Sequence, residues 1–315
     1  MRYGEILTNS NIVDVTSLVK NYDDLTAVNG ITFSVNKGEV FSLLGPNGAG
    51  KTTTIEILET LRSHSSGSVT VFGRDLFNRK NHELIRNRIG VMPQNFNAFD
   101  WLTVSENLSY FKSIYRSNID IMDLIGIVNL ESKKDSLYKN LSGGLKQRLG
   151  IAITLINDPD LIFLDEPTSG LDPKARRDTW DLIIKLRNHG KSILLTTHYM
   201  EEAQALSDRI AIMINGEIID SGTSDFLISK YGGSKNIIVK QFTDEFKNLF
   251  DKSIVLDDGH RLLINYESSE DLLKIIKALE STGSVNAEFE IKTPTMEDVF
   301  LKITGKRIST EGKIS

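Results

Sequence analysis

The fold of this chain is decided by residues 45–53, which read Gly45-Pro46-Asn47-Gly48-Ala49-Gly50-Lys51-Thr52-Thr53. The stretch matches the pattern G-x-x-x-x-G-K-[ST] without a mismatch. Glycines let such a loop bend so that successive backbone N–H groups point at phosphate oxygens. In this pattern Lys51 reaches the β- and γ-phosphates of a nucleotide, and the Thr52 hydroxyl ligates Mg²⁺.

The flanking sequence gives the loop the context that it needs. Residues 40–44 form a short apolar run, which predicts a buried strand. Residues 54–58 place apolar side chains at helical spacing, so a helix follows the loop and adds its positive N-terminal end. A chance glycine-rich turn would not require this strand–loop–helix order.

An acidic motif lies far downstream. Residues 161–166 are four apolar residues followed by Asp165 and Glu166. A buried strand that ends in Asp places that carboxylate beside the Mg²⁺, so we expect Asp165 to hold the metal through water. Glu166 would then face the γ-phosphate as general base. The alternative is a solvated strand end with two incidental acids; the order of the motifs and Pro167 after Glu166 argue against it.

With residues 141–148, Leu-Ser-Gly-Gly-Leu-Lys-Gln-Arg, the chain resembles the ATP-binding cassette (ABC) ATPases over roughly residues 10 to 222. The resemblance implies that Ser142, Gly143 and Gly144 open a helix whose N-terminus contacts the γ-phosphate held by an opposite subunit. Ser142 is also a suitable helix cap. The family's usual fifth residue is Gln where this chain has Leu145, a departure common among drug-export-like members.

Four further residues match the family, and each has a simpler alternative. Gln94 matches the glutamine that touches Mg²⁺ or the attacking water, but a lone Gln is often polar surface. Asp172 matches the loop that crosses to the other subunit, or it caps a helix before Pro173. His198 matches the switch histidine at the γ-phosphate, or it is a structural histidine. Tyr22 matches the aromatic that stacks on adenine, or it is a core tyrosine.

The fold implied by the resemblance is an α/β P-loop NTPase cassette with a RecA-like core, an antiparallel β subdomain and a helical subdomain at about residues 95–150. Residues 104–115 and 119–130 show helical spacing of apolar side chains. In the family this insert receives a helix of a membrane protein. Phe96, Phe99 and Trp101 either line such a docking groove or pack inside the insert.

Composition sets limits on the class of protein. The chain has 315 residues, no cysteine and a net charge of −5, so disulfides and thiol chemistry are excluded and a basic nucleic-acid binder is not expected. No apolar run approaches the roughly 20 residues that cross a bilayer, and the first ten residues hold no signal-peptide core. We therefore expect a cytoplasmic protein.

The cassette pattern ends near residue 222, so the expected domains are 1–222 and a small α+β accessory domain at 223–315. Glycines at 232 and 233 indicate a hinge. A hairpin is expected at 253–266 around 257–259, and a helix at 270–279 with Gly283 as terminator. A last helix is expected to start at 293–294. No ligand-binding pattern is found in this region.

Two segments resemble the ABC-2, daunorubicin-resistance-like branch of drug, antibiotic and polysaccharide exporters. They are residues 198–203, His-Tyr-Met-Glu-Glu-Ala, and residues 294–301, Pro-Thr-Met-Glu-Asp-Val-Phe-Leu. From the residues alone, the second segment is an amphipathic helix that closes a small domain. The resemblance suggests roles in dimer stabilisation and regulation.

The resemblance implies that two cassettes, as a homodimer or with a homologous ATPase, face head to tail and enclose two ATP molecules with Mg²⁺. One side supplies Lys51, Thr52, Gln94, Asp165, Glu166 and His198, and the other supplies Ser142, Gly144 and Asp172. Closure on ATP would drive separate transmembrane permease subunits at the inner face of the membrane.

Three functions stay open. The expected one is export of a drug, antibiotic or other lipophilic compound, with lipid or polysaccharide as further substrates. An importer ATPase is the second, since the helical insert does not rule it out and only the C-terminal motif points to export. A soluble ABC ATPase acting on ribosomes or DNA is the third; the single cassette, the absence of sustained heptads and the acidic balance argue against it.

Overall fold

The computed structural model describes residues 11–250, 254–256, 261–282 and 287–305. The described chain divides into two compact units between Ser224 and Asp225, and each is treated by itself. Within these described stretches, no helix has the length and apolar character that crossing a membrane requires.

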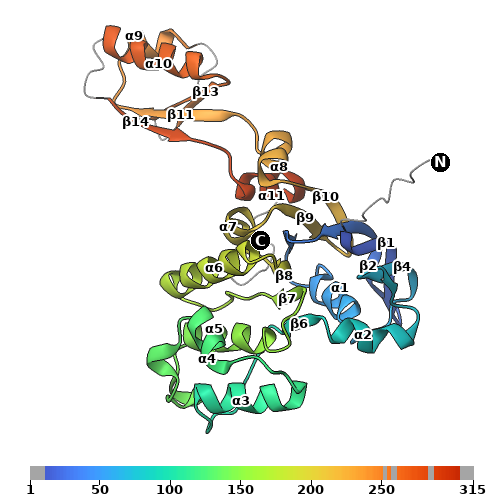
Figure 1. Cartoon of the computed structure of the whole chain (residues 1–315). Helices are drawn as coiled ribbons and strands as arrows, with labels where there is room; N and C mark the ends of the chain where they lie inside the picture. Colours follow the sequence, from blue (N-terminus) through green and yellow to red (C-terminus); the bar gives the residue numbers. More distant parts are fainter. Residues whose placement is uncertain (1–10, 251–253, 257–260, 283–286, 306–315) are drawn as a thin grey trace, which may run out of the picture. The chain divides into compact units, whose positions relative to one another are not determined.

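The first unit is built on a six-stranded sheet in the order β10-β9-β3-β8-β7-β6 (Figure 1). Neighbouring strands from β6 to β9 run parallel, and β10 runs antiparallel to β9. The carboxyl ends of parallel strands meet at one edge of the sheet, where α/β proteins bind ligands. The strands are β3 (Val40–Leu44), β6 (Ile89–Met92), β7 (Leu161–Asp165), β8 (Ser192–Thr197), β9 (Arg209–Ile214) and β10 (Glu217–Gly222).

A second, antiparallel sheet has the order β2-β1-β4-β5. Its strands are β1 (Asn11–Tyr22), β2 (Leu25–Asn36), β4 (Ser66–Val71) and β5 (Arg74–Asp75). Apolar residues of this sheet form one buried cluster with residues of α1 (Lys51–Leu58) and of the core sheet. That shared cluster packs β1, whose last residue is Tyr22, against α1 and the core sheet.

Helices cover the core sheet. Besides α1, they are α2 (His82–Arg86), which follows the short 3-10 turn η1 (Arg79–Asn81), α6 (Pro173–Asn188) and α7 (Met200–Leu206). The predicted helix at 54–58 is confirmed, and it begins three residues earlier, because Gly50 takes a left-handed conformation that starts it at Lys51. The strand predicted at 40–44 is confirmed without change.

The helical insert contains α3 (Val104–Tyr115), α4 (Ile121–Ile127), the 3-10 turns η2 (Glu131–Lys133) and η3 (Tyr138–Asn140), and α5 (Gly143–Thr154). The helix predicted at 104–115 is confirmed, and a capping box of Thr103 and Glu106 starts it. The helix predicted at 119–130 is shorter than expected. Asp120 caps its first turn, and Asn129 has a positive φ of 55°, so the chain leaves the helix before that residue.

The second unit has the order strand-helix-strand-strand-helix-strand, flanked by two helices. Its antiparallel sheet runs β12-β13-β11-β14, which is the arrangement of the ferredoxin-like motif. The elements are α8 (Ser224–Tyr231), β11 (Lys235–Lys240), α9 (Asp244–Asn248), β12 (Ile254–Leu256), β13 (Arg261–Tyr266), α10 (Ser269–Ser281), β14 (Glu288–Lys292) and α11 (Met296–Thr304). Apolar residues of β11, β13, α9 and α10 form its core.

The predictions for this unit are partly confirmed. β12 and β13 pair as the expected hairpin, whose turn at 257–259 lies outside the described residues. α10 covers the expected helix at 270–279, and its predicted terminator Gly283 is also outside them. The start predicted for the last helix at 293–294 is wrong: Thr295 is the N-cap and the helix begins at Met296. The glycines at 232–233, predicted as a hinge, lie inside the second unit and not at its boundary, which falls between Ser224 and Asp225.

Candidate active site

The loop between β3 and α1 requires glycine at two crowded positions. A Cβ on Gly45 would lie 2.1 Å from the backbone oxygen of Met213, and one on Gly50 would lie 2.4 Å from that of Ala27. Gly50 also has a φ of 99°, a region that L side chains rarely adopt. The loop is therefore wedged against neighbouring strands, and its backbone N–H groups precede the N-terminus of α1, where anions bind favourably.

Lys51 occupies the centre of this loop with 5% of its surface exposed. Its ammonium donates to the carbonyl oxygens of Gly45 at 2.7 Å and Pro46 at 3.0 Å, and lies 3.6 Å from Glu166 Oε1. Burial lowers the pKa of Lys51, and the negative charges of Glu166 and Asp165 oppose that fall. The backbone and both acids thus hold a cation at the point where phosphate charge would concentrate.

Thr52 and Asp165 bring oxygen ligands together at the start of α1 and the end of β7. Thr52 Oγ1 donates to Asp165 Oδ2 at 3.1 Å, and the Thr196 hydroxyl donates to the other carboxylate oxygen. Burial raises the pKa of Asp165, against the effect of these two hydrogen bonds. A buried carboxylate beside a hydroxyl fits Mg²⁺, which prefers oxygen and completes its shell with water and substrate phosphates. In the described part of the chain, no three His, Cys, Asp or Glu side chains could hold a metal by themselves.

Glu166 is held from several sides. Gln94 Nε2 donates to its Oε2 at 3.1 Å, and His198 Nδ1 lies 3.1 Å from the same oxygen. Its φ of 49° is rare for a side-chain-bearing residue, and its backbone N–H donates to the Thr196 carbonyl at 3.2 Å. Burial alone would raise the pKa of Glu166, but the hydrogen bond with His198 and the charge of Lys51 bring it below its usual range. The carboxylate is ionised at neutral pH and faces the loop.

These groups border a cleft of about 540 Å³. Tyr22 lies at its rim and is partly exposed, so the alternative of a core tyrosine is wrong. The cationic groups of Lys20 and Arg62 lie 4.8 Å and 5.6 Å from the centre of its ring. The cleft is lined by Tyr22, Leu25, Thr26, Ala27, Asn47, Gly48, Ala49, Gly50, Lys51, Thr52, Thr53, Gln94, Glu166, Asn215 and Gly216.

Sequence reasoning missed two sides of this cleft. Residues 25–27 come from the start of β2, and Asn215-Gly216 forms the turn between β9 and β10. Gly216 N donates to the Ala49 carbonyl at 3.0 Å, which ties this turn to the phosphate loop. Asn-Gly between apolar residues is a strong hairpin signal, so the turn itself was predictable from the sequence.

The structure leaves the Ser142 motif and Asp172 outside the cleft of the same chain. Ser142 and Gly143 are exposed; Ser142 is the N-cap of α5, but its side chain makes no capping hydrogen bond. Asp172 is exposed as well, and it caps α6 by accepting from the N–H groups of Lys174 and Ala175 at 3.0 Å and 2.9 Å. The cap prediction for Asp172 is confirmed.

The three aromatic residues after Gln94 divide between their two predicted environments. Phe96 packs inward, because a Cβ on Gly150 would lie 2.9 Å from its ring. Phe99 is 45% exposed and stacks edge-on against Tyr110, and Trp101 is 74% exposed. A docking surface at Phe99 and Trp101 stays a prediction.

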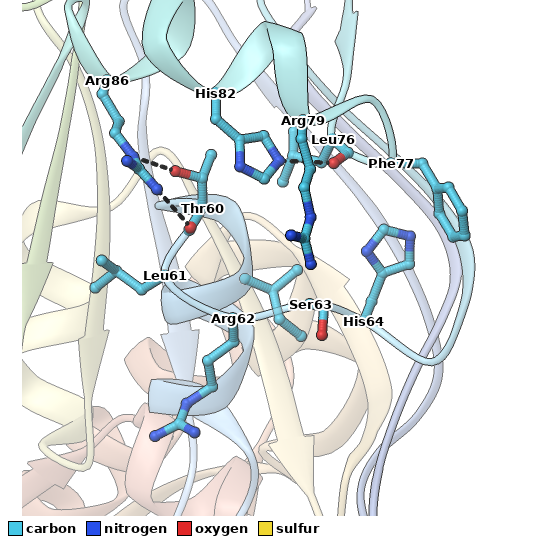
Figure 2. A pocket seen from close by; sticks show the side chains of 11 residues that line it. Thr60, Leu61, Arg62, Ser63, His64, Leu76, Phe77, Arg79, His82 and Arg86 are labelled. Atoms are coloured by element: carbon cyan, nitrogen blue, oxygen red, sulfur yellow. Dashed lines mark hydrogen bonds between the residues drawn. The ribbon is translucent and has the colours of Figure 1, made fainter.

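A second cleft, of about 590 Å³, lies between the end of α1 and residues 76–86 (Figure 2). Arginine and histidine side chains line it, but most are bonded within the protein. Arg86 donates to the hydroxyl and the carbonyl oxygen of Thr60 at 2.7 Å and 3.1 Å, and His82 Nε2 lies 2.9 Å from the Leu76 carbonyl (Figure 2). Arg62 pairs with Glu56. These bonds stabilise the junction between α1 and α2.

Comparisons with known proteins agree with this geometry. The family profile described as "ABC transporter" matches residues 28–169. Nod factor export ATP-binding protein I of Rhizobium meliloti (strain 1021) is 36% identical over 310 residues, which cover 94% of this chain and 89% of that protein. The protein of the same name from Burkholderia pseudomallei (strain 1710b) is 36% identical over 306 residues, covering 94% and 98%.

Solved structures share the cassette fold. CbiO1 from Clostridium perfringens, described as part of the ABC transporter complex cbiONQ, gives a TM-score of 0.65 at 26% identity and covers 70% of this chain and 92% of its own. The dimeric structure of MJ0796, a bacterial ABC transporter cassette, gives 0.60 at 27% identity, covering 67% and 98%. A post-hydrolysis state of the same cassette is bound to ADP and Pi, with the same scores.

Proposed function

The chain belongs to the ABC transporter family as an ATP-hydrolysing cassette, and we propose that it powers export through separate membrane subunits, as a dimer that encloses two ATP molecules. The position of Glu166 is the main support for ATP hydrolysis. Its carboxylate oxygens lie 3.6 Å from Lys51 Nζ and 3.1 Å from both Gln94 Nε2 and His198 Nδ1. It is a fixed carboxylate at the phosphate end of the cleft.

Each residue has a definite task in this proposal. Lys51 and the loop N–H groups bind the β- and γ-phosphates, and Tyr22 stacks on the base at the other end of the cleft. Thr52, Asp165 and Gln94 hold Mg²⁺, which neutralises charge on the phosphate oxygens when bound. Glu166 accepts a proton from the attacking water, and His198 orients that carboxylate and contacts the γ-phosphate.

The exposed start of α5 supports a site completed by a second copy. Ser142 and Gly143 are exposed at the N-terminus of α5, where the first backbone N–H groups of a helix have no partner within the helix and anions are stabilised. We infer that this end, with Asp172, closes over the nucleotide of a partner cassette. The dimeric MJ0796 cassette shows that related chains associate in pairs.

Export is supported by the relatives that match along most of both chains, since they are named for Nod factor export. CbiO1 supports assembly with other subunits, because it is described as part of a transporter complex. We infer that this chain docks on permease subunits at the inner face of the cell membrane. A lipophilic drug or antibiotic as substrate stays a prediction, because the relatives carry neither word in their names.

The chemical half of the proposal is tested by replacing Glu166 with Gln. Loss of the base should lower the hydrolysis rate roughly 10²–10⁴-fold, while ATP affinity is retained and an ATP-dependent dimer accumulates in size-exclusion chromatography. Glu201→Gln is the control, since Glu201 is exposed on α7. Full turnover by Glu166→Gln would remove this residue as the base.

The transport half is tested by crosslinking tagged Glu166→Gln in native membranes with ATP and identifying the bound proteins by mass spectrometry. Recovery of a polytopic membrane protein would support transport and identify the subunit that holds the substrate. Recovery of ribosomal or DNA-bound partners alone would overturn transport and leave the ATPase chemistry intact. Lys51→Ala is the control for ATP-dependent capture.

A further inference from the structure

Glu202 is a fully buried carboxyl that the hydrolysis chemistry does not use. It lies on α7 with 0% of its surface exposed. Its Oε1 accepts hydrogen bonds from Thr168 Oγ1 at 2.7 Å and Trp180 Nε1 at 3.0 Å. Burial raises the pKa of Glu202, and hydrogen bonds from Thr197, Thr168 and Trp180 oppose the rise. A buried carboxyl is costly unless hydrogen bonds satisfy it. Oε1 of Glu202 accepts two such bonds, while its buried Oε2 has no hydrogen-bond partner among the described residues.

The partners of Glu202 come from three segments that surround the active site. Thr168 lies two residues after Glu166, and Trp180 lies on α6. Thr197 ends β8 and directly precedes His198. One carboxyl therefore joins α6 to the segment that carries the base and to the strand end that carries the switch histidine.

A chain of side-chain contacts makes a second connection between α6 and His198. The guanidinium of Arg176, on α6, lies 4.4 Å from the centre of the Tyr199 ring. The Tyr199 ring centre lies 4.1 Å from that of His198. The charge of Arg176 also lowers the pKa of Glu202, so both connections meet at one cluster, which we define as Arg176, Tyr199 and Glu202.

The N-terminal end of α6 supports the surface that a second copy would contact. Asp172 caps this end. A Cβ on Gly144 would lie 2.7 Å from Ala175 Cβ, so α5 and α6 touch without space between them at this point. A small shift of Ser142 or Asp172 must therefore move α6, because close-packed interiors transmit displacement.

We propose that Glu202, with Arg176, is a positioning residue that ties the orientation of His198 to α6. Contact of the Ser142–Asp172 surface with the nucleotide of a second copy then sets His198 against Glu166 in the same chain. This inference rests on the proposed two-copy site. It assigns coupling between the two ATP sites to a cluster that does not line the cleft.

Trp180 provides the measurement, since its indole N–H is bonded to Glu202. The chain has two tryptophans, and Trp101→Phe leaves Trp180 as the only one. In this background, Glu202→Leu removes the acceptor while it keeps an apolar filling, and Glu202→Gln keeps one acceptor oxygen. The readouts are kcat and KM for ATP and the change of Trp180 emission on adding ATP.

The expected result is a split between kcat and KM. Glu202→Leu should bind ATP as the parent does, lose the ATP-induced change of Trp180 emission, and hydrolyse roughly 10–100-fold more slowly; Glu202→Gln should recover most of both. Arg176→Gln tests the same cluster without a buried hole and should show the same split if Glu202→Leu does not fold. The matched control is Arg177→Gln, because Arg177 is exposed on the same helix.

Two outcomes must be separated. If Glu166→Gln in the single-tryptophan background forms no ATP-dependent dimer, the proposed two-copy function fails. If that dimer forms, two results would overturn the positioning role. One is hydrolysis of ATP at the parental rate by Glu202→Leu and Arg176→Gln. The other is a change of their kcat and KM without loss of the ATP-induced change of Trp180 emission. Unchanged Trp180 emission in the trapped dimer would also overturn it.

Discussion

Replacing Glu59 by Gln should make the stability of the first unit less sensitive to a rise in pH from 4.5 to about 8. Glu59 follows α1 directly and is 5% exposed. Burial, followed by the negative charges of Asp165 and Glu56, raises the pKa of Glu59 from 4.5 to about 8. Its place at the C-terminal end of a helix, where carbonyl dipoles disfavour a negative charge, acts in the same direction.

The sign of the effect follows from proton linkage. The native state keeps a proton on Glu59 that the unfolded state releases above pH 4.5, so stability falls as the pH rises from 4.5 to about 8. At about 1.4 kcal/mol per unit of pKa, the full loss is roughly 5 kcal/mol. The loss is roughly 1 kcal/mol at about pH 5.5 and roughly 3 kcal/mol at about pH 7. Gln is neutral at every pH and of the same shape, so it should not show this loss.

Urea unfolding followed by tryptophan fluorescence measures the difference, because Trp101 and Trp180 both lie in the first unit. The measurement is made in EDTA and without nucleotide, so that no bound metal offsets the negative charge of Asp165, which contributes to the raised pKa of Glu59. The stability advantage of Glu59→Gln should grow by roughly 3 kcal/mol between about pH 5.5 and 8.5. Glu83→Gln, on the exposed face of α2, should run parallel to the wild type. If the free energy of unfolding of Glu59→Gln also changed with pH in parallel with that of the wild type, the reasoning would be refuted.

Three further predictions concern the site and the domain boundary. Lys51→Ala should weaken ATP binding roughly 10–100-fold by removing a charge-assisted contact; unchanged affinity in a fluorescent-nucleotide titration would contradict the phosphate assignment. Ser142→Arg should leave ATP binding by the monomer intact and abolish the ATP-dependent dimer in the Glu166→Gln background; a dimer that still forms would exclude Ser142 from the interface. Removal of all residues after Ser224 should leave the first unit folded with a melting temperature near that of the full chain, and its collapse in circular dichroism would show that the units depend on each other.

The parts of the site that the sequence predicts are those encoded within a few neighbouring residues. The strand before the phosphate loop, the helix after it and the Asp165–Glu166 strand end each carry a local pattern of glycine, apolar and acidic residues. Because the strands that precede Lys51, Glu166 and His198 run parallel side by side, the order of motifs also implied that these residues meet.

Contacts between distant segments could not be read in the same way. The Asn215-Gly216 turn was recognisable, but its hydrogen bond to Ala49 depends on how β9 pairs with β3. In the second unit β14 reads Glu-Phe-Glu-Ile-Lys, and this alternation of polar and apolar residues was a strand signal that the sequence analysis did not use. In the sequence Glu202 resembles any charged residue on a short helix. Only the structure shows that it is buried and bonded to Thr168 and Trp180.

Exposure divides the predicted site residues in a way that bears on the need for a second copy. Lys51, Asp165, Glu166 and His198 are each at most 8% exposed and bind one another, so their geometry is complete within one chain. Ser142 and Asp172 are exposed. The buried Glu166 carboxylate and the solvent-facing start of α5, which does not line the cleft, have no chemical use for each other inside one molecule. The exposure of the helix start is explained if its N–H groups bind phosphate held by another copy, because anion binding at a helix N-terminus needs an open, accessible end. The absence of a dimer in Glu166→Gln with ATP would leave the exposed Ser142 and Gly143 unexplained and would confine hydrolysis to the groups around Lys51.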